Sequence, residues 1–338
     1  MKKRVNVFLY VILAIVLCYG YWHFEGTIHK RLSIAKQYLK REKERREMHK
    51  VLVNMDMIPS LIDEPGAWYT KYHVIAHSGG GINGKCYTNS KEAWDYHYAH
   101  GTRIFDADLS YTSDSVLVLR HGWNDNLEQT SESIKASKYI KDRNGSLGYE
   151  MSKPDLMDFQ TFIKENIYFF YSPQSVHDMI HFMKIHPDVY MATDIKNANL
   201  TKGYLDIVKC ANDSDATDVL DRIIASVYTD NDLSDVQRSY PFRQIVIRQY
   251  INHPHNYSEL AALCIRNNIH VVNVSACYAE DEGIKWLHSK GIHTYIAVVD
   301  FLSDMSEYRK LGFEGCVSNY IDEDDYCQSS PLNNERPN

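Results

Sequence analysis

The sequence predicts an α/β protein, a (β/α)8 TIM barrel preceded by an N-terminal transmembrane helix and a charged juxtamembrane helix. Three observations lead to this prediction. An uncharged run near the start of the 338-residue chain is long enough to cross a bilayer. Short apolar runs then alternate with helical patterns, as in parallel α/β sheets. Two of these runs are too close together for a crossover helix, which leaves eight strands for the barrel.

The uncharged run covers residues 5–22 and follows Met-Lys-Lys-Arg. A cleaved signal sequence is the alternative, but the run is long for a signal core and has no small-x-small cleavage site. We therefore expect a retained single-pass membrane anchor within residues 1–26. Basic residues flank both ends of the run, so the positive-inside rule does not decide the orientation. Of the two orientations, we expect the one with the body of the protein on the extracytoplasmic side.

Residues 27–71 are expected to form a charged juxtamembrane helix and linker, because apolar residues at helical spacing precede a run of mixed charge. The first 50 residues carry 12 of the 37 Lys and Arg and 4 of the 44 Asp and Glu, so the rest of the chain carries 25 against 40. Such an acidic body is unsuited to nucleic acid, and we expect no nucleic-acid partner.

The barrel is expected over residues 72–322, followed by a polar tail at 323–338. Its apolar runs are residues 73–76, 103–109, 116–119, 189–193, 223–227, 245–247, 270–274, 294–298 and 315–317. The second and third runs are separated only by "SYTSDS", which suits a hairpin. Counting that hairpin partner out leaves eight strands and favours a closed barrel, with an open doubly wound sheet as the alternative.

Polar side chains gather at the C-terminal ends of four of these predicted strands, where barrel enzymes assemble their active sites. Asp106 and Asp108 are two residues apart, so they point to the same face of a strand. The whole set is His77, Asp106, Asp108, His121, Asp194 and Lys196. Two histidines can serve as acid and base, a lysine can stabilise phosphoryl charge, and clustered carboxylates can share a proton or hold a cation.

In order and spacing, these residues resemble the glycerophosphodiester phosphodiesterases and their phosphatidylinositol-specific phospholipase C-like relatives. The matching segments are "AHSGG", "YTNSKEA", "FDAD", "LRHGW" and "TDIK", from residue 77 to residue 196. The resemblance implies a hydrolase of phosphodiesters, derived from lipids or polymers, that works through a cyclic phosphate, and the uncharged run at 5–22 adds the membrane anchor. It implies His77 as base and His121 as acid, and Asp106, Asp108 and Asp194 as ligands of a divalent cation, Mg²⁺ or Ca²⁺.

Further substrate or phosphate contacts are expected from Lys196, Gly79, Trp123 and Tyr250, with Arg248 and Gln249 also at a strand end. Glycine lets the backbone approach a ligand closely. For the aromatic residues, packing is the alternative, because rings at strand ends more often fill space than bind substrate.

The chain departs from the family pattern at several positions. Ser78 replaces an arginine, Thr88 a glutamate and Gly122 an aspartate, while Asp106 and Asp194 stand where the family has glutamates. A shorter and less anionic cation site follows. Two other functions therefore stay open: a catalytically weakened barrel that binds phospho-ligands or a partner, and a metal-independent phospholipase C-like enzyme in which Lys196 or an arginine replaces the cation.

Overall fold

The structure of the chain is a computed structural model. It describes residues 60–123, 138–141, 147–150, 155–196, 199–249, 257–276, 279 and 281–329. The predicted transmembrane helix, most of the predicted juxtamembrane segment and residues 330–338 of the predicted polar tail lie outside these residues. Within the described part of the chain, no helix combines the length and the apolar character that a bilayer crossing requires.

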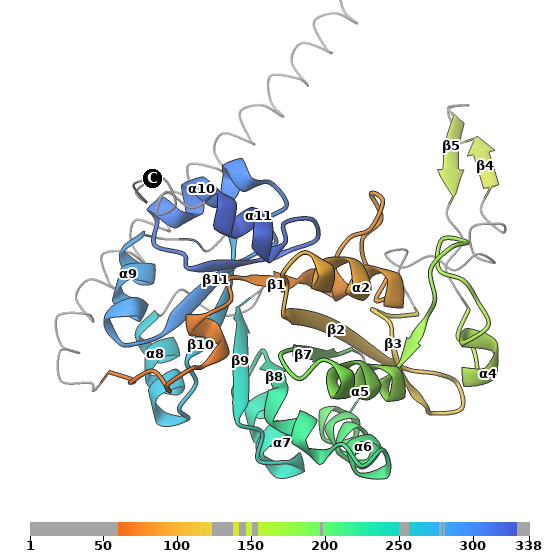
Figure 1. Cartoon of the computed structure of the whole chain (residues 1–338), viewed down its shortest axis with the longest axis horizontal. Coiled ribbons are helices and arrows are strands. Elements are labelled where there is room, and N and C mark those ends of the chain that lie inside the picture. The colour runs from red at the N-terminus through yellow and green to blue at the C-terminus, as the bar shows by residue number, and fades with distance from the viewer. Residues whose placement is uncertain are drawn as a thin grey trace, which may run out of the picture. The chain divides into compact units, whose positions relative to one another are not determined.

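Eight parallel strands close into a barrel (Figure 1), because β1 pairs with both β2 and β12. The strands are β1 (Val74–Ala76), β2 (Ile104–Tyr111), β7 (Tyr190–Ile195), β8 (Ile223–Val227), β9 (Gln244–Gln249), β10 (Val271–Ser275), β11 (His293–Ala297) and β12 (Gly315–Ser318). The predicted barrel is confirmed, and the open doubly wound sheet is excluded by the closing β1–β2 pair.

The predicted hairpin is also confirmed. β3 (Leu117–Leu119) runs antiparallel to β2, and the short β6 (Gln174–Ser175) pairs antiparallel with β3, so both extend the sheet outside the closed ring. Between them lie α4 (Phe159–Phe162) and a separate two-stranded ribbon of β4 (Lys138–Lys141) and β5 (Leu147–Glu150). The sequence patterns did not predict β4, β5 or β6.

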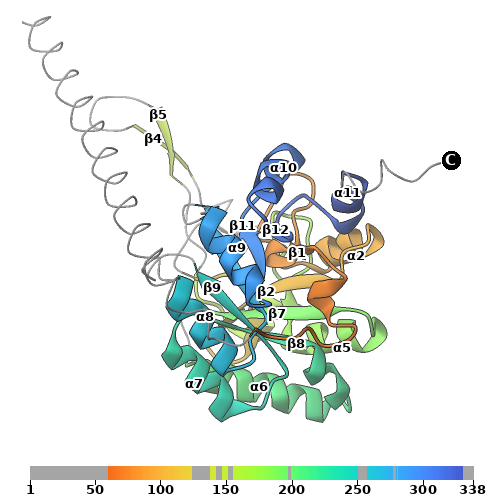
Figure 2. The ribbon, with the colours of Figure 1, turned by 90° about the vertical axis from the view of Figure 1, so that its left-hand side faces the viewer.

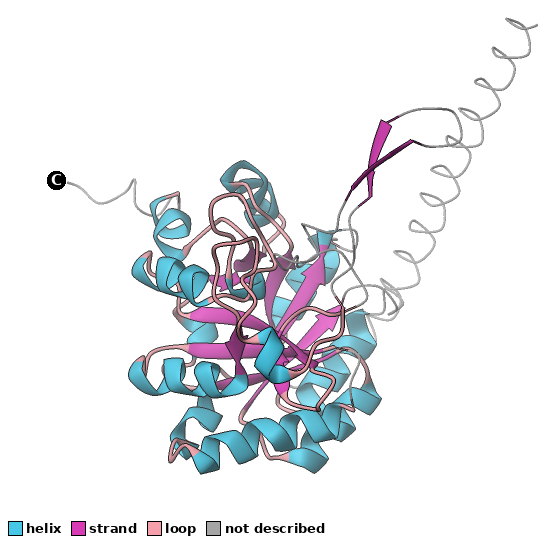
Figure 3. Cartoon of the chain, turned by 90° about the vertical axis from the view of Figure 1, so that its right-hand side faces the viewer, coloured by secondary structure: helices cyan, strands magenta, loops and turns pink. Residues whose placement is uncertain are grey.

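Helices surround the strands (Figure 3). They are α2 (Lys91–Ala99), α5 (Val176–Ile185), α6 (Leu200–Asp213), α7 (Asp230–Ser239), α8 (Tyr257–Arg266), α9 (Asp281–Ser289), α10 (Leu302–Lys310) and α11 (Glu323–Gln328), with 3-10 turns η1 (Trp68–Thr70), η2 (His77–Gly79) and η3 (Thr217–Arg222). α5 and α7 begin with capping boxes. The Ser175 side chain accepts from the backbone N–H of Asp178, and the Asp178 side chain accepts from that of Ser175; Thr229 and Asp232 do the same at α7. α5 thereby begins directly after β6, and α7 follows β8 after two intervening residues.

The N-terminal end of the barrel is filled with apolar side chains. The segment before β1 runs across this end (Figure 2), and the backbone N–H of Leu61 donates to the carbonyl of Lys290 at 2.8 Å. Trp68 and Tyr69 pack there against residues of the strands, including Ile104 and Val246. This packing stabilises the closed ring at the N-terminal ends of its strands. The predicted polar residues lie at the C-terminal ends.

Candidate active site

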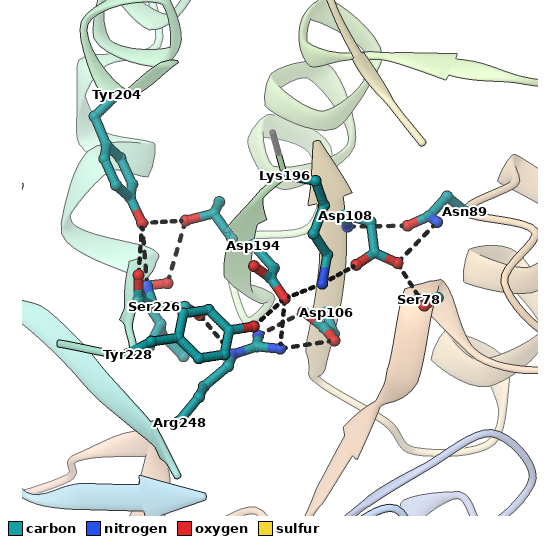
Figure 4. A network of polar contacts seen from close by, with 12 residues as sticks. Ser78, Asn89, Asp106, Asp108, Asp194, Lys196, Tyr204, Ser226, Tyr228 and Arg248 are labelled. Carbon is teal, nitrogen blue, oxygen red and sulfur yellow. Dashed lines mark hydrogen bonds and ion pairs between the residues drawn. The ribbon is translucent and has the colours of Figure 1, made fainter. Parts of the chain in front are cut away.

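The structure brings the six predicted polar residues to the C-terminal end of the barrel. His77 begins η2 directly after β1. His121 comes two residues after β3, and the residue between them, Arg120, donates its backbone N–H to the backbone carbonyl of Asp108 at 2.8 Å. Asp108 of β2 lies opposite Asp194 of β7 in the strand register, so these two carboxylates are neighbours (Figure 4). The neighbouring strands therefore place distant parts of the sequence in one cluster.

Arg248 on β9 is the centre of this cluster. Its guanidinium forms two hydrogen bonds with Asp106, at 2.6 and 3.1 Å, and its Nη1 lies 3.4 Å from Asp194 Oδ2. The side chains of Arg248 and Asp106 are 2% and 1% exposed. A forked arginine–carboxylate pair shielded from water is a strong charge-assisted contact, so this pair holds the carboxylates in a defined geometry.

Lys196 provides the second cation. Its Nζ lies 2.6 Å from Asp194 Oδ2 and 3.5 Å from Asp108 Oδ1, and Tyr228 donates its hydroxyl to the same Asp194 oxygen at 2.6 Å. Burial alone raises the pKa of Asp194, but Arg248 and Lys196 outweigh it and hold that pKa below its usual value. Burial likewise lowers the pKa of Lys196, but Asp194 and Asp108 raise it overall, so Lys196 stays protonated.

A divalent cation at Asp106, Asp108 and Asp194 does not fit these contacts. Both oxygens of Asp106 accept from Arg248, and Asp108 Oδ2 accepts from Ser78 Oγ at 2.5 Å and from the amide of Asn89 at 3.3 Å. Mg²⁺ and Ca²⁺ need six or more oxygen ligands, including carboxylate lone pairs that face the ion. Here the side chains of Arg248 and Lys196 face the carboxylate oxygens instead of a metal ion. The divalent cation expected from the sequence stays a prediction.

A different group of possible metal ligands lies at the other end of β1. Ligand atoms of His73, Glu323 and Cys327 lie within 4.8 Å of one another. However, the Glu323 carboxylate accepts the backbone N–H groups of His73 and Val74, both at 2.9 Å, and the His73 ring nitrogen lies 2.7 Å from it. These bonds tie α11 to the start of β1, so the group has a structural role at the opposite end of β1 from His77.

His77 is oriented by two residues that the sequence patterns did not single out. Its Nδ1 lies 3.0 Å from Asn319 Oδ1, while the Asn319 amide nitrogen donates to both oxygens of Asp300, at 3.2 and 3.0 Å. Since the amide nitrogen faces Asp300, the amide oxygen faces His77 and accepts a hydrogen bond from its Nδ1–H. The Nε2 of His77 is then the atom that can accept a proton from a substrate.

Tyr87 stands between the two histidines. The centroid of its ring is 4.9 Å from that of His77 and 5.3 Å from that of His121, edge-on in both cases. Its backbone adopts a left-handed conformation with φ of 59°, which a bulky side chain rarely adopts. The strained backbone at Tyr87 thus directs its ring into the space between the two histidines.

The positions that depart from the family pattern have structural partners. Ser78 bonds Asp108 as described above, and Thr88, fully buried, shares a hydrogen bond of 3.0 Å with the Ser90 hydroxyl. The Gly122 carbonyl accepts from Nε of Arg120 at 2.9 Å. Hydrogen bonds to neighbouring residues therefore account for Ser78, Thr88 and Gly122, and none of these three residues supplies a further carboxylate to the cluster.

The other residues expected to contact substrate are Gly79, Trp123 and Tyr250. The indole N–H of Trp123 donates to the carbonyl of Tyr111 at 2.8 Å, which is a packing contact. A Cβ on Gly79 would lie 2.6 Å from Trp94 Nε1, so the lack of a side chain there is already required by packing. Tyr250 lies outside the described residues.

The fold is that of solved glycerophosphodiester phosphodiesterases. A glycerophosphoryl diester phosphodiesterase from Parabacteroides distasonis superposes with a TM-score of 0.55 at 16% identity, covering 82% of this chain and 95% of that one. A phosphodiesterase from Oleispira antarctica, in complex with the product sn-glycerol-3-phosphate, gives 0.57 at 11% identity, with 77% and 98% covered. A glycerophosphodiester phosphodiesterase from Agrobacterium tumefaciens gives 0.53 at 11%, with 76% and 99% covered.

Sequence comparison adds nothing to this likeness. No protein-family model matches the chain, and no curated protein matches it. The expected resemblance is therefore confirmed at the level of the fold.

Proposed function

We propose that this chain is a divergent member of the glycerophosphodiester phosphodiesterase family and hydrolyses a phosphodiester by acid–base catalysis with two histidines. One observation carries the proposal: His77 and His121 flank one ring, that of Tyr87, beside a buried cluster of carboxylates and cations. The fold shared with phosphodiesterases and the product named in the Oleispira structure support the same class of substrate.

In the proposed reaction, His77 Nε2 takes a proton from the hydroxyl neighbouring the ester. That oxygen attacks phosphorus and forms a cyclic phosphate, while His121 gives a proton to the departing oxygen. Water then opens the ring with the roles of the histidines reversed. The contact from His77 to Asn319 supports His77 as the base, because it leaves Nε2 as the accepting atom.

Positive charge comes from side chains in this proposal. Lys196, 24% exposed, is accessible to a phosphoryl oxygen and stabilises the charge that develops there. Arg248, 2% exposed, neutralises Asp106 and keeps Asp194 in place to hold Lys196. The fork between Arg248 and Asp106 favours this metal-independent form of the enzyme over the form with Mg²⁺ or Ca²⁺.

A panel of glycerophosphodiesters with different headgroups tests the activity. We expect the purified full-length chain to release a phosphomonoester and an alcohol from at least one of them, with a cyclic phosphate visible by ³¹P NMR before ring opening. Binding of these diesters without hydrolysis of any would instead favour the catalytically weakened barrel.

We also propose that the chain is anchored in a membrane by residues 1–26, with the barrel on the extracytoplasmic side. Support comes from the sequence alone, in the uncharged run at 5–22. The full-length protein should therefore sediment with membranes and resist extraction by high salt, and a chain truncated near residue 50 should not. A mature chain that begins near residue 23 would show that the run is a cleaved signal.

A further inference from the structure

Exposed apolar side chains gather at the C-terminal end of the barrel. Ten large apolar side chains are exposed among the described residues, and five of them lie on segments next to the candidate active site. These five, here called the apolar rim, are Phe169, Phe170, Val298, Phe301 and Tyr320. Single exposed apolar residues are ordinary on any protein, but a concentration of them around one opening is characteristic of interaction surfaces.

The segments that carry the apolar rim adjoin one another on the His77 side of the site. The backbone N–H of Gly81, in the loop after β1, donates to the carbonyl of Asn319, next to Tyr320. On the other flank of that loop, Asn83 donates its amide to the hydroxyl of Tyr171 at 3.2 Å. The β1 loop thus connects the segment after β12 with the segment that carries Phe169 and Phe170.

Phe170 is held outward by this arrangement. It is 78% exposed, and the two residues before it, Tyr168 and Phe169, both have left-handed backbones, with φ of 49° and 71°. Two residues after it, Ser172 is bound to Glu92 through its backbone N–H at 2.9 Å and its hydroxyl at 2.8 Å. Phe301, 68% exposed, stands directly before α10 on the loop after β11.

Lys85 adds a cation to the same surface. Its Nζ lies 5.1 Å from the centroid of the Tyr168 ring, and the side chain is exposed. Aromatic side chains with a nearby cation match the interfacial layer of a bilayer, where rings settle at the level of the headgroups and cations meet phosphates.

We infer that the apolar rim contacts a lipid surface, and that the substrate is a phosphodiester lipid whose acyl chains remain in that surface while its phosphate reaches His77. This inference rests on the proposed function for its catalytic part. The chain itself suggests the occupant: its uncharged run ends at residue 22, and the 37 residues from 23 to 59 precede Ser60. Even if fully helical they span roughly 55 Å, so a membrane that holds the run is within reach of the barrel.

A comparison of two substrates with the same headgroup tests the inference. The full-length chain is assayed on phosphatidylglycerol in mixed micelles, whose headgroup carries the hydroxyl that attacks phosphorus and whose leaving group is diacylglycerol, and on its deacylated, water-soluble glycerophosphodiester. The double variant Phe170→Ser/Phe301→Ser should lose about tenfold in kcat/KM on the lipid and stay within about twofold on the soluble diester. The matched control is Ile185→Ser/Leu205→Ser, which removes two side chains of 57% and 47% exposure from α5 and α6. It should change neither rate.

Equal losses on both substrates, or no loss on the lipid, would overturn the inference. A second measurement does not depend on catalysis and separates failure of the rim from failure of the proposed function. In nanodiscs containing brominated lipid, the full-length Phe170→Trp variant should show more tryptophan quenching than the wild type, and Ile185→Trp should show no increase. Equal quenching at both positions would mean that the rim does not face the lipid, whatever the enzyme does.

Discussion

Replacing His77 or His121 by alanine is expected to lower the turnover of a phosphodiester about 10²- to 10⁴-fold, the usual effect of losing one acid–base group. Both rings meet Tyr87 edge-on at the mouth of the barrel, so neither variant removes a buried core residue. The measurements are kcat on the best diester of the panel and the circular dichroism melting curve, which should change little. His177→Ala, an exposed histidine on α5, is the matched control.

The leaving group separates the two roles. A diester with a good leaving group, such as p-nitrophenol, needs no protonation of the departing oxygen. The His121→Ala variant should therefore regain much of its rate on such a substrate, whereas His77→Ala, which lacks the base, should not. Rescue of His77→Ala alone would exchange the assigned roles, and near-normal rates of both variants on every diester would contradict acid–base catalysis by these histidines.

The sequence predicts the barrel and the gathering of the six polar residues at one end of it, because both follow from local patterns. Apolar runs marked all eight barrel strands to within a few residues, and the short "SYTSDS" connection marked the hairpin of β2 and β3. Parallel strands in one barrel end on one side, so the polar residues at the ends of β1, β2 and β7 had to come together. His121 follows the antiparallel β3 and joins them through the hairpin with β2. The two-residue spacing of Asp106 and Asp108 likewise determined that they share a face.

The pairing of charges could not be predicted in the same way. Arg248 was noticed at a strand end, but its partner Asp106 is 142 residues away, and only the closed ring brings β9 to face β2. Asn319 carried no recognisable motif, because an amide after a strand usually ends a turn. Its task depends on Asp300, which fixes the orientation of the amide toward His77. Such roles arise from contacts across the barrel and leave no periodic signal.

Activity in excess chelator is expected to equal activity without it, because Arg248 and Lys196 supply the positive charge in the cluster.

The Arg248→Met variant is expected to be strongly destabilised. Removing the guanidinium leaves the Asp106 carboxylate, 1% exposed, buried without its counter-charge. Breaking such a buried pair typically costs about 3–5 kcal/mol of unfolding free energy. Urea unfolding of wild type and variant measures the loss. Arg222→Met, whose guanidinium bonds main-chain carbonyls, controls for removing a partly buried arginine away from the site.

The same variant tests whether Arg248 takes the place of a divalent cation. Removing the guanidinium frees both oxygens of Asp106, while Asp108 and Asp194 keep their contact with the ammonium of Lys196, so carboxylate oxygens become available to a hard cation. Mn²⁺ should bind Arg248→Met, measured by electron paramagnetic resonance, and raise its stability, because a ligand that binds only the folded state shifts the equilibrium. The double variant Arg248→Met/Asp106→Asn should recover stability without Mn²⁺ and bind the ion less tightly. Loss of wild-type activity in chelator, together with equal Mn²⁺ affinity of wild type and Arg248→Met, would instead establish a metal site beside an intact Arg248–Asp106 pair.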